Sequence, residues 1–363
     1  MKVAIVYDRV NKWGGAERVL LALHEIWAEA PLFTAVYDAK RASWAKVFQV
    51  HSSFLQHVPF AKKNHEYYPW LTPMAFESFS FDGYDVVLSV TSAEAKDIIT
   101  KPGTVHICYC LTPTRYLWSG EKEYLKYSDS FSSFMFRIWR TTLKRWDLVA
   151  ASRPDYYLAI SEHIADRIKK YYHRETEKVI YPPVDTKKFS VISHQSSDYF
   201  LCVSRLVPYK RVDLVIDAFN QLGWPLKIIG SGRSRSKLKS MAKKNIEFVG
   251  GDLTDSQLVA YDQKARAFVF GGVEDFGIVS LEAQAAGKPV ICYRDSGMAE
   301  TVVEGKTGEF FNKPSAASLI DALRKFDKGW YDSGSCRKNA EKFSVIRFQK
   351  EIKEAVVRLS KNV

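Results

Sequence analysis

The chain has 363 residues, of which 46% are hydrophobic and 14% aromatic, and a formal net charge of +12. This length accommodates two domains of ordinary size, and the composition excludes a long disordered chain. The basic charge predicts an anionic partner, which charge alone leaves open among nucleic acid, an anionic membrane surface and a phosphorylated ligand.

The N-terminus has a short apolar run that Asp8 and Arg9 interrupt, which is too short for the core of a signal peptide. No stretch approaches eighteen uncharged apolar residues, so the sequence predicts a cytoplasmic protein. The cysteines are odd in number, and two of them have a spacing that does not suit zinc. We expect all five to be reduced core residues: Cys108, Cys110, Cys202, Cys292 and Cys336.

The first half of the chain alternates strand-like and helical segments. A strand at 2–7 is followed by a loop with Gly14 and Gly15, and then by a helix whose apolar residues recur at helical spacing. This alternation favours a parallel, doubly wound α/β sheet. Further strands are expected at 32–37, 85–90, 105–110 and 156–161.

The pattern restarts after Pro182 and Pro183, which make the junction extended and stiff. Strands alternate with helices again from residue 199 onward. We therefore predict an N-terminal domain at 1–184 and a second domain at 185–340, with a C-terminal helix at 341–363 that packs back toward the first.

Two glutamates eight residues apart, Glu274 and Glu282, stand at the end of a predicted strand and in the helix that follows it. The turn between these elements lies at the carboxyl edge of the sheet, where α/β proteins bind ligands. Backbone N–H groups at Phe276, Gly277 and Ile278 would face an anion there. Two acids would repel an anion, so they fit better as acceptors for hydroxyl groups of a ligand with phosphates and sugars. The alternative is that Glu282 complements the helix dipole and Glu274 is solvated.

Two cations and a glycine turn stand at other edge turns of the same domain. Arg205 and Lys210 follow the first strand of this domain, and both could reach one diphosphate. They could equally be solvated surface charges. The turn that starts at Gly230 would let the backbone approach a ligand closely, although such a turn is a weak signal by itself.

Five segments occur in an order that resembles a known family: "SRLVPYK", "IIGSG", "FVGGDLTDSQL", "EDFGIVSLEAQAAGKPVI" and "GMAETV…GKTGEFF". They are similar to the nucleotide-sugar-binding domain of GT4 retaining glycosyltransferases, whose fold is GT-B with two Rossmann-like domains facing a cleft. "EDFGIVSLE" matches the E-x7-E signature of that family. In the first half, "WGGAERVL", "YCLTPTRYLW" and "AISEHIADRI" resemble WbaZ-like mannosyltransferases of O-antigen and polysaccharide assembly.

This resemblance implies roles for particular residues. Arg205 and Lys210 would hold the donor diphosphate, Glu274 would contact the transferred sugar, and Glu282 would bind the ribose. Backbone at Phe276, Gly277 and Ile278 would support sugar and phosphate, and Gly14 and Gly15 would approach the donor from the other domain. The resemblance implies transfer without a metal ion, consistent with two fixed cations beside the leaving diphosphate.

The implied reaction moves a hexose, with mannose from GDP-mannose as first choice, onto a lipid-linked glycan at the cytoplasmic face of the membrane. The expected acceptor is undecaprenyl-diphosphate-linked.

One residue departs from the family: Leu111 stands where a histidine is common, and Leu neither donates nor accepts a hydrogen bond. His106 would point to the other face of its strand. This departure supports one alternative, a nucleotide-sugar-binding partner subunit with reduced or lost transfer. A sugar-nucleotide epimerase on the same fold is a further alternative.

A predicted helix at 131–146 combines aromatic and basic residues. Its apolar residues Phe131, Phe134, Met135, Ile138, Trp139 and Leu143 fall on one helical face, with cations mostly off it. The segment at 60–70 adds aromatic and basic residues in the same domain. The pattern is typical of a helix on an anionic membrane surface, and equally of a helix packed into the domain with a solvated basic rim. Nucleic acid is not expected, because no recognised module is present and the cations are dispersed.

Overall fold

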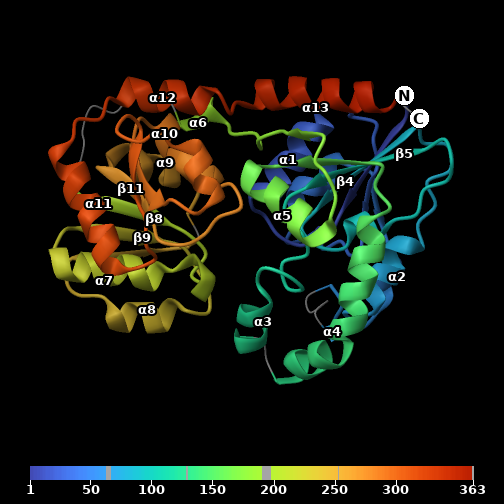
Figure 1. Ribbon diagram of the computed structural model, residues 1–363, viewed down its shortest axis with the longest axis horizontal. Helices are drawn as coiled ribbons and strands as arrows, with labels where there is room; N and C mark the ends of the chain where they lie inside the picture. Colours follow the sequence, from blue (N-terminus) through green and yellow to red (C-terminus); the bar gives the residue numbers. More distant parts are fainter. Residues whose placement is uncertain (63–66, 128–129, 190–197, 252, 362–363) are drawn as a thin grey trace. The chain divides into compact units, whose positions relative to one another are not determined.

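A computed structural model describes residues 1–62, 67–127, 130–189, 198–251 and 253–361. The chain forms two compact units, which we describe separately. The N-terminal unit comprises Met1–Tyr181 and Phe348–Val363, and the C-terminal unit comprises Pro182–Arg347. Each unit is built on one parallel sheet covered by helices, as predicted (Figure 1).

The N-terminal unit contains a seven-stranded sheet in the order β3-β2-β1-β4-β5-β6-β7. Its central strands are buried along their whole length, because helices cover both faces of a parallel sheet. The strands are β1 (Val3–Tyr7), β2 (Leu32–Thr34), β3 (Val50–Ser52), β4 (Val86–Thr91), β5 (Val105–Cys110), β6 (Tyr156–Ala159) and β7 (Lys178–Val179). The expected strands at 2–7, 85–90 and 105–110 are confirmed, whereas β2 is shorter than expected and the short edge strands β3 and β7 were missed.

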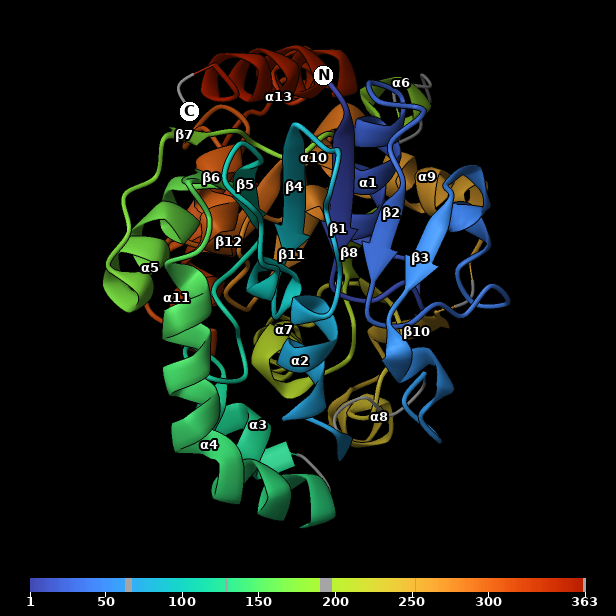
Figure 2. The same cartoon turned by 90° about the vertical axis from the view of Figure 1, so that its right-hand side faces the viewer.

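The helices of this unit are α1 (Gly15–His24), α2 (Leu71–Glu77), α3 (Glu121–Tyr127), α4 (Ser130–Ala151) and α5 (Glu162–Tyr172), with short 3-10 turns η1 (Ser43–Val47), η2 (Phe54–His57) and η4 (Ala95–Asp97). Figure 2 shows the strands running in one direction, with α4 extending past their carboxyl ends. Most of α13 (Val345–Leu359) also belongs to this unit. Its Phe348 ring lies 5.9 Å from the Tyr109 ring of β5, and Arg358 forms an ion pair with Glu177 at 3.1 Å.

The C-terminal unit contains a six-stranded parallel sheet in the order β10-β9-β8-β11-β12-β13. Its strands are β8 (Phe200–Val203), β9 (Leu226–Ile229), β10 (Ile246–Gly250), β11 (Ala267–Phe270), β12 (Val290–Tyr293) and β13 (Gly308–Phe311). Its helices are α6 (Thr186–Phe189), α7 (Val212–Leu222), α8 (Arg235–Met241), α9 (Asp255–Lys264), α10 (Ile278–Ala285), α11 (Ala316–Lys328) and α12 (Ser333–Glu341), with 3-10 turns η5 (Pro208–Lys210) and η6 (Gly297–Thr301).

The hydrophobic core of the C-terminal unit forms where α7 and α11 pack on one face of the sheet. Phe200, Phe219 and Phe326 meet there, with ring centroids 5.2 to 5.9 Å apart. Apolar residues of the strands complete this core because a parallel sheet buries both of its faces. The packing fixes the strands, and with them the turns at their carboxyl ends.

The structure shows the state of the cysteines and the character of the helices. All five cysteines are buried free thiols, as predicted, and burial raises the pKa of Cys202 to about 12. Among the described residues, no helix is both long enough and apolar enough to span a bilayer.

Candidate functional site

The candidate site lies where the strand order of the C-terminal sheet reverses. Strands β9 and β10 lie on one side of β8, and β11 leads the chain to the other side. In open parallel sheets, ligands bind outside the carboxyl ends of the strands at this reversal. The turn after β8 carries Arg205 and Lys210, and the turn after β11 carries Glu274. The topology therefore places at one edge of the sheet the three residues that were predicted to hold the diphosphate and the transferred sugar.

Lys210 and Glu274 form an ion pair across this reversal, from Lys210 Nζ to Glu274 Oε1. The side chains are 9% and 18% exposed. The ammonium group of Lys210 also lies 5.0 Å from the centre of the Tyr209 ring and 5.7 Å from that of Phe270. Aromatic faces attract cations and exclude water, so the Lys210 charge is held in a partly desolvated position. The sequence predicted that both residues lie at the site, but not that they pair.

Arg205 is the more accessible cation of the two. Its Nη2 donates to the Tyr209 hydroxyl over 2.6 Å, and this contact is exposed to solvent. Tyr209 therefore contacts both cations, one through its hydroxyl and the other through its ring face. Two cations on one short turn suit a ligand with several anionic oxygens, because Arg offers a fork of donors and Lys a point charge.

Gly230 is required by the packing of the chain against itself. Its φ is +147°, and a Cβ there would lie 1.8 Å from the carbonyl oxygen of Ser204. At Gly272, which precedes the Glu274 turn, a Cβ would lie 2.7 Å from the Lys210 carbonyl oxygen. Both glycines let the edge turns approach one another closely. The structural need for Gly230 is thus visible, and its contact with a ligand stays a prediction.

The backbone of Glu274 is held by the start of η6 and the residue before it. The Ser296 hydroxyl accepts a hydrogen bond from the Glu274 N–H over 2.9 Å, and the Gly297 N–H donates to the Glu274 carbonyl over 2.9 Å. A Cβ at Gly297 would lie 2.1 Å from the Asp275 carbonyl oxygen. Sequence reasoning missed Ser296 and Gly297 as residues of the site. The "DSG" turn after β12 was the available signal, because it also lies at the carboxyl edge.

The predicted donor-binding residues after Glu274 lie at the start of α10. Phe276 is 3% exposed, with its ring 5.8 Å from that of Phe343, and Gly277 caps the N-terminus of the helix in a left-handed conformation with φ of +93°. Ile278 is the first residue of α10. Glu282 stands in the second turn and is only 2% exposed. Glu274 is therefore partly accessible to a ligand, whereas Glu282 is buried. A ribose contact of Glu282 stays a prediction.

Gly14 and Gly15 belong to the N-terminal unit. Gly14 precedes α1 with an extended backbone, and a Cβ there would lie 3.1 Å from Glu17 Oε2. Glu17 is buried and accepts a hydrogen bond from the Tyr7 hydroxyl over 2.7 Å. Gly15 is the first residue of α1. Both glycines lie after β1, which is where the strand order of the N-terminal sheet reverses between β1 and β4.

A second set of polar residues at this reversal was missed by sequence reasoning. The Asp8 carboxylate, directly after β1, accepts a hydrogen bond over 2.7 Å from the hydroxyl of Thr91, the last residue of β4, and one over 2.9 Å from the Ala95 N–H, after β4. Arg9 forms an ion pair with Glu94 over 2.5 Å. The position of Asp8 and Arg9 immediately after the first strand was a usable signal.

Leu111 directly follows β5, and its N–H donates to the Thr91 carbonyl over 2.7 Å. His106 does not replace the missing histidine, in line with its predicted orientation. It is 1% exposed, and its Nε2 lies 2.8 Å from the Ser89 hydroxyl of the adjacent strand β4. Burial, reinforced by Arg153 and Arg174, lowers the pKa of His106 to about 3. His106 is therefore a neutral side chain of the core.

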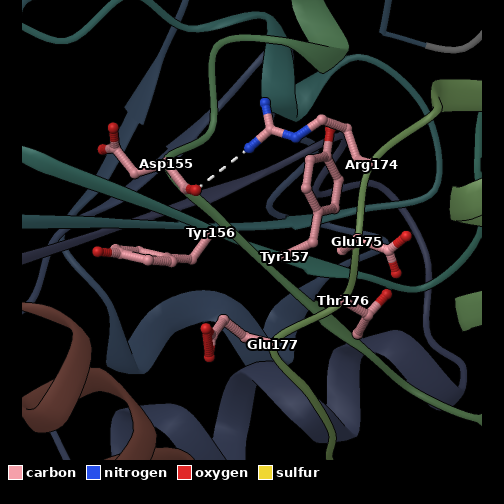
Figure 3. Close-up of a pocket in the computed structure, with 7 residues that line it drawn as sticks. All are labelled: Asp155, Tyr156, Tyr157, Arg174, Glu175, Thr176 and Glu177. Carbon is pink, nitrogen blue, oxygen red and sulfur yellow. Dashed lines mark hydrogen bonds between the residues drawn. The ribbon is translucent and has the colours of Figure 1, made fainter.

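A separate polar pocket of the N-terminal unit carries none of the predicted site residues. Its lining comes from residues 155–157 and 174–177 (Figure 3). Arg174 donates from Nη1 to the Ser152 carbonyl over 3.0 Å and from Nη2 to the Pro154 carbonyl over 2.7 Å, and its guanidinium lies 5.4 Å from the centre of the Tyr157 ring. These contacts connect the segment after α5 to β6 and to the residues before it.

Among the described residues, no group of three or more His, Cys, Asp or Glu side chains could hold a metal ion.

Known structures with the same arrangement define the class of the fold. HepE of Anabaena, solved in complex with UDP, is 18% identical to this chain, with a TM-score of 0.72 and coverage of 99% of this chain and 100% of HepE. The galactosyltransferase WaaB of the lipopolysaccharide outer core is 18% identical, with a TM-score of 0.69 and coverage of 99% of both chains. The fold is the GT-B fold predicted from the sequence.

The sequence comparisons show what the chain is similar to. Residues 184–343, most of the C-terminal unit, match the sequence model of the glycosyl transferases group 1 family. A GDP-mannose-dependent alpha-(1-6)-phosphatidylinositol monomannoside mannosyltransferase of Mycobacterium tuberculosis is 35% identical over 34% of this chain and 36% of its own length. Alpha-1,3/1,6-mannosyltransferase ALG2 of Dictyostelium discoideum is 24% identical over 77% of both chains. The chain spans about half or less of the length of several curated relatives that it matches.

Proposed function

We propose that the protein is a metal-independent, retaining glycosyltransferase that transfers a hexose from a nucleotide-sugar donor to a lipid-linked glycan. The observation that carries this proposal is the ion pair of Lys210 and Glu274 at the reversal of the C-terminal sheet, beside Arg205. Cations at this edge suit a diphosphate, and a carboxylate beside them suits the hydroxyl groups of the attached sugar.

In the proposed reaction, Lys210 and Arg205 stabilise the negative charge that develops on the leaving diphosphate. A fixed donor in a partly desolvated site stabilises developing charge more than one in bulk water, because it does not have to reorient. Glu274 orients the sugar by accepting hydroxyl hydrogen bonds. Its backbone is fixed by Ser296 and Gly297, so the turn that carries the carboxylate has a defined position at the site.

We propose GDP-mannose as the donor and an undecaprenyl-diphosphate-linked glycan of polysaccharide or O-antigen assembly as the acceptor. The mycobacterial relative is named as GDP-mannose-dependent, and ALG2 is named as a mannosyltransferase, which supports mannose. HepE has been solved with UDP-glucose, which makes a UDP-sugar the alternative donor.

The donor and the transfer can be tested in two steps. Thermal-shift screening against GDP-, UDP- and ADP-sugars identifies the donor, because a ligand at 100 times its dissociation constant adds roughly 2.7 kcal/mol to the stability. Transfer of a labelled hexose to extracted lipid acceptor is then measured. Glu274→Ala is expected to lower transfer by roughly 100-fold or more. Glu247→Ala is the matched control, because Glu247 is 57% exposed and pairs with Lys227 on β9.

Two results would contradict the proposal. Either no nucleotide sugar stabilises the protein, or the Glu274→Ala variant transfers the hexose at the rate of the Glu247→Ala control.

Leu111 supports a second candidate, a nucleotide-sugar-binding partner subunit with reduced transfer. His106 is held in the core by Ser89, so no histidine of this strand is available at the position after β5. This candidate predicts donor-dependent stabilisation without transfer to the lipid acceptor, and a gain of transfer in Leu111→His. Rapid transfer by the unaltered protein would exclude it.

We further propose that α4 places the protein on an anionic membrane surface. The predicted single apolar face of this helix is wrong, because its apolar residues divide between two faces. Phe136 and Leu143 are buried against Leu117, whereas Phe131, Phe134 and Ile138 are 55 to 60% exposed. The exposed apolar residues lie among the exposed cations Arg137, Arg140 and Arg145. Aromatic and basic residues on one surface suit an anionic bilayer.

The segment at 60–70 adds to this surface in part. Phe60 is 73% exposed, and the Tyr67 ring lies 5.6 Å from that of Phe131. Residues 63–66 of the segment lie outside the described residues.

Sedimentation with liposomes tests the membrane proposal. We expect cosedimentation with anionic vesicles that weakens at high salt, and a clear loss in Phe134→Ser/Ile138→Ser. Trp330→Ser is the control, because Trp330 is 82% exposed and belongs to the C-terminal unit. Sedimentation that responds to neither lipid charge nor salt would exclude this role.

A further inference from the structure

The charge of Lys210 is already neutralised by a residue of the site itself. Its ammonium group pairs with Glu274, and the aromatic rings of Tyr209 and Phe270 cover part of its surroundings. A diphosphate that approaches Lys210 must therefore also approach the Glu274 carboxylate. Both side chains are less than one fifth exposed, so water screens this repulsion less than it would at the surface.

Glu274 has little freedom to turn away from such an anion through its backbone. Its N–H is bound by the Ser296 hydroxyl and its carbonyl by the Gly297 N–H. Three residues after Glu274, Gly277 caps the start of α10 with a φ of +93°, and a Cβ there would lie 2.8 Å from Met298 Cε. The turn is therefore packed on η6, and the Glu274 side chain, which pairs with Lys210, extends from a fixed backbone position.

We propose that Glu274 lowers the affinity of this site for a nucleoside diphosphate that carries no sugar, and that the sugar of an intact donor removes this penalty. The inference rests on the proposed function. An ionised carboxylate only accepts hydrogen bonds. The terminal phosphate of a bare diphosphate offers mainly acceptor oxygens, whereas sugar hydroxyls can donate to the carboxylate. The same side chain thus repels the product and binds the donor.

The proposal assigns Glu274 a role in specificity that is distinct from its role in orienting the sugar. Once the hexose has been transferred, the remaining diphosphate faces the Glu274 carboxylate without the hydroxyl groups that had separated them. Release of the product is thereby favoured, and competition by free nucleoside diphosphate against the donor is reduced.

Calorimetric titration with GDP and with UDP tests the inference in the full chain. Glu274→Gln removes the negative charge and keeps the shape and an oxygen acceptor for Lys210. We expect it to bind at least one of the two nucleotides about 3- to 10-fold more tightly than the unaltered protein, the range expected for one partly exposed charge. Binding of the corresponding nucleotide sugar should not tighten.

Glu247→Gln is the control for net charge. It removes one carboxylate from a Lys–Glu pair of the same unit, on the edge strand β10, and should leave nucleotide affinity unchanged. Glu274→Asp gives a second variant in case Glu274→Gln is poorly folded. It keeps the charge but withdraws it by one methylene group, so we expect tightening smaller than that of Glu274→Gln.

The possible results separate this inference from the proposed function. If the nucleotides bind, but neither variant of Glu274 binds them more tightly than the unaltered protein and Glu247→Gln do, the inference is wrong and the proposed function stands. If GDP, UDP and their sugars bind to none of the proteins, both are wrong.

Discussion

Asp262 is a buried acid in α9, and it makes the stability of the C-terminal unit sensitive to pH. The residue is 2% exposed, and its Oδ1 has no hydrogen-bond partner in the described part of the chain. Burial raises the pKa of Asp262 to about 8. Because this pKa is higher in the folded than in the unfolded chain, the folded state binds the additional proton, and stability falls as the pH rises from about 4 to about 8.

We predict that Asp262→Asn stabilises the protein at alkaline pH. The amide has the shape of the acid and carries no charge, so it should add on the order of 2 kcal/mol or more to the free energy of unfolding at pH 8.5 and little at pH 4.5. Thermal unfolding across this pH range measures the difference. Asp217→Asn is the control, because Asp217 is exposed on α7. An equal effect of Asp262→Asn at both pH values would contradict this account.

The residues of the candidate site differ in how far sequence could predict them. Arg205, Lys210 and Glu274 follow an apolar strand by two, seven and four residues, so local pattern alone places them at the carboxyl edge. Ser296 fixes Glu274 from 22 positions further along the chain. That contact depends on how two loops approach each other, which no local pattern contains. The pairing of Lys210 with Glu274 depends in the same way on which strands are neighbours.

Helix α4 is held to its sheet by a buried charge cluster around Asp147. Lys96 of η4 is 1% exposed and pairs with Asp147 over 2.5 Å. Asp147 also accepts hydrogen bonds from the Thr114 hydroxyl over 2.6 Å and from Trp118 Nε1 over 2.7 Å. The cluster therefore ties α4 both to the end of β4 and to the segment after β5.

We predict that Asp147→Ala destabilises the N-terminal unit by roughly 3–5 kcal/mol, because it removes the nearer carboxylate partner of the buried Lys96 and leaves only Asp97, whose Oδ1 lies 3.4 Å from Lys96 Nζ. Denaturant unfolding measures the loss. The double variant Lys96→Met/Asp147→Leu should recover a large part of it, since replacing a buried ion pair by apolar groups is often neutral. No recovery in the double variant would show that the hydrogen bonds to Thr114 and Trp118 matter more than the charge.

The two faces of α4 also show that helical periodicity does not predict which apolar residues are buried. Residues at 131, 134 and 138 share one face by spacing, and spacing correctly groups them. Their burial depends on what covers each face. Phe136, which lay outside the predicted stripe, is 1% exposed because Leu117, Tyr116 and Tyr124 surround it. Tertiary contacts thus decide which apolar face of this helix becomes core.

At the scale of the whole molecule, the N-terminal unit is made from two separated segments of the chain. Helix α13 supplies Phe348, Ile352, Val356 and Leu359, all fully buried, after the chain has formed the C-terminal unit. Gln349 Nε2 binds Glu25 Oε2 over 2.5 Å, at the end of α1. The last helix is therefore a part of the N-terminal core.

We predict that Phe348→Ala lowers the stability of the N-terminal unit by roughly 3–5 kcal/mol, the usual cost of removing a buried aromatic ring. Ile346→Ala, on the same helix, should cost much less because Ile346 is 69% exposed. Thermal unfolding of both variants gives the comparison. Equal destabilisation would show that α13 acts through its helical propensity and not through its buried face.

The separated segments of the N-terminal unit set an order of events during synthesis. Residues 1–181 leave the ribosome first, yet the hydrophobic surface that receives α13 stays uncovered until residues 348–359 have emerged. At common translation rates this takes roughly 10 to 30 s. The C-terminal unit, which is continuous from 182 to 347, can complete its fold earlier than the unit that precedes it. A nascent chain stalled before residue 348 should therefore be a preferred substrate of chaperones that bind exposed apolar surface.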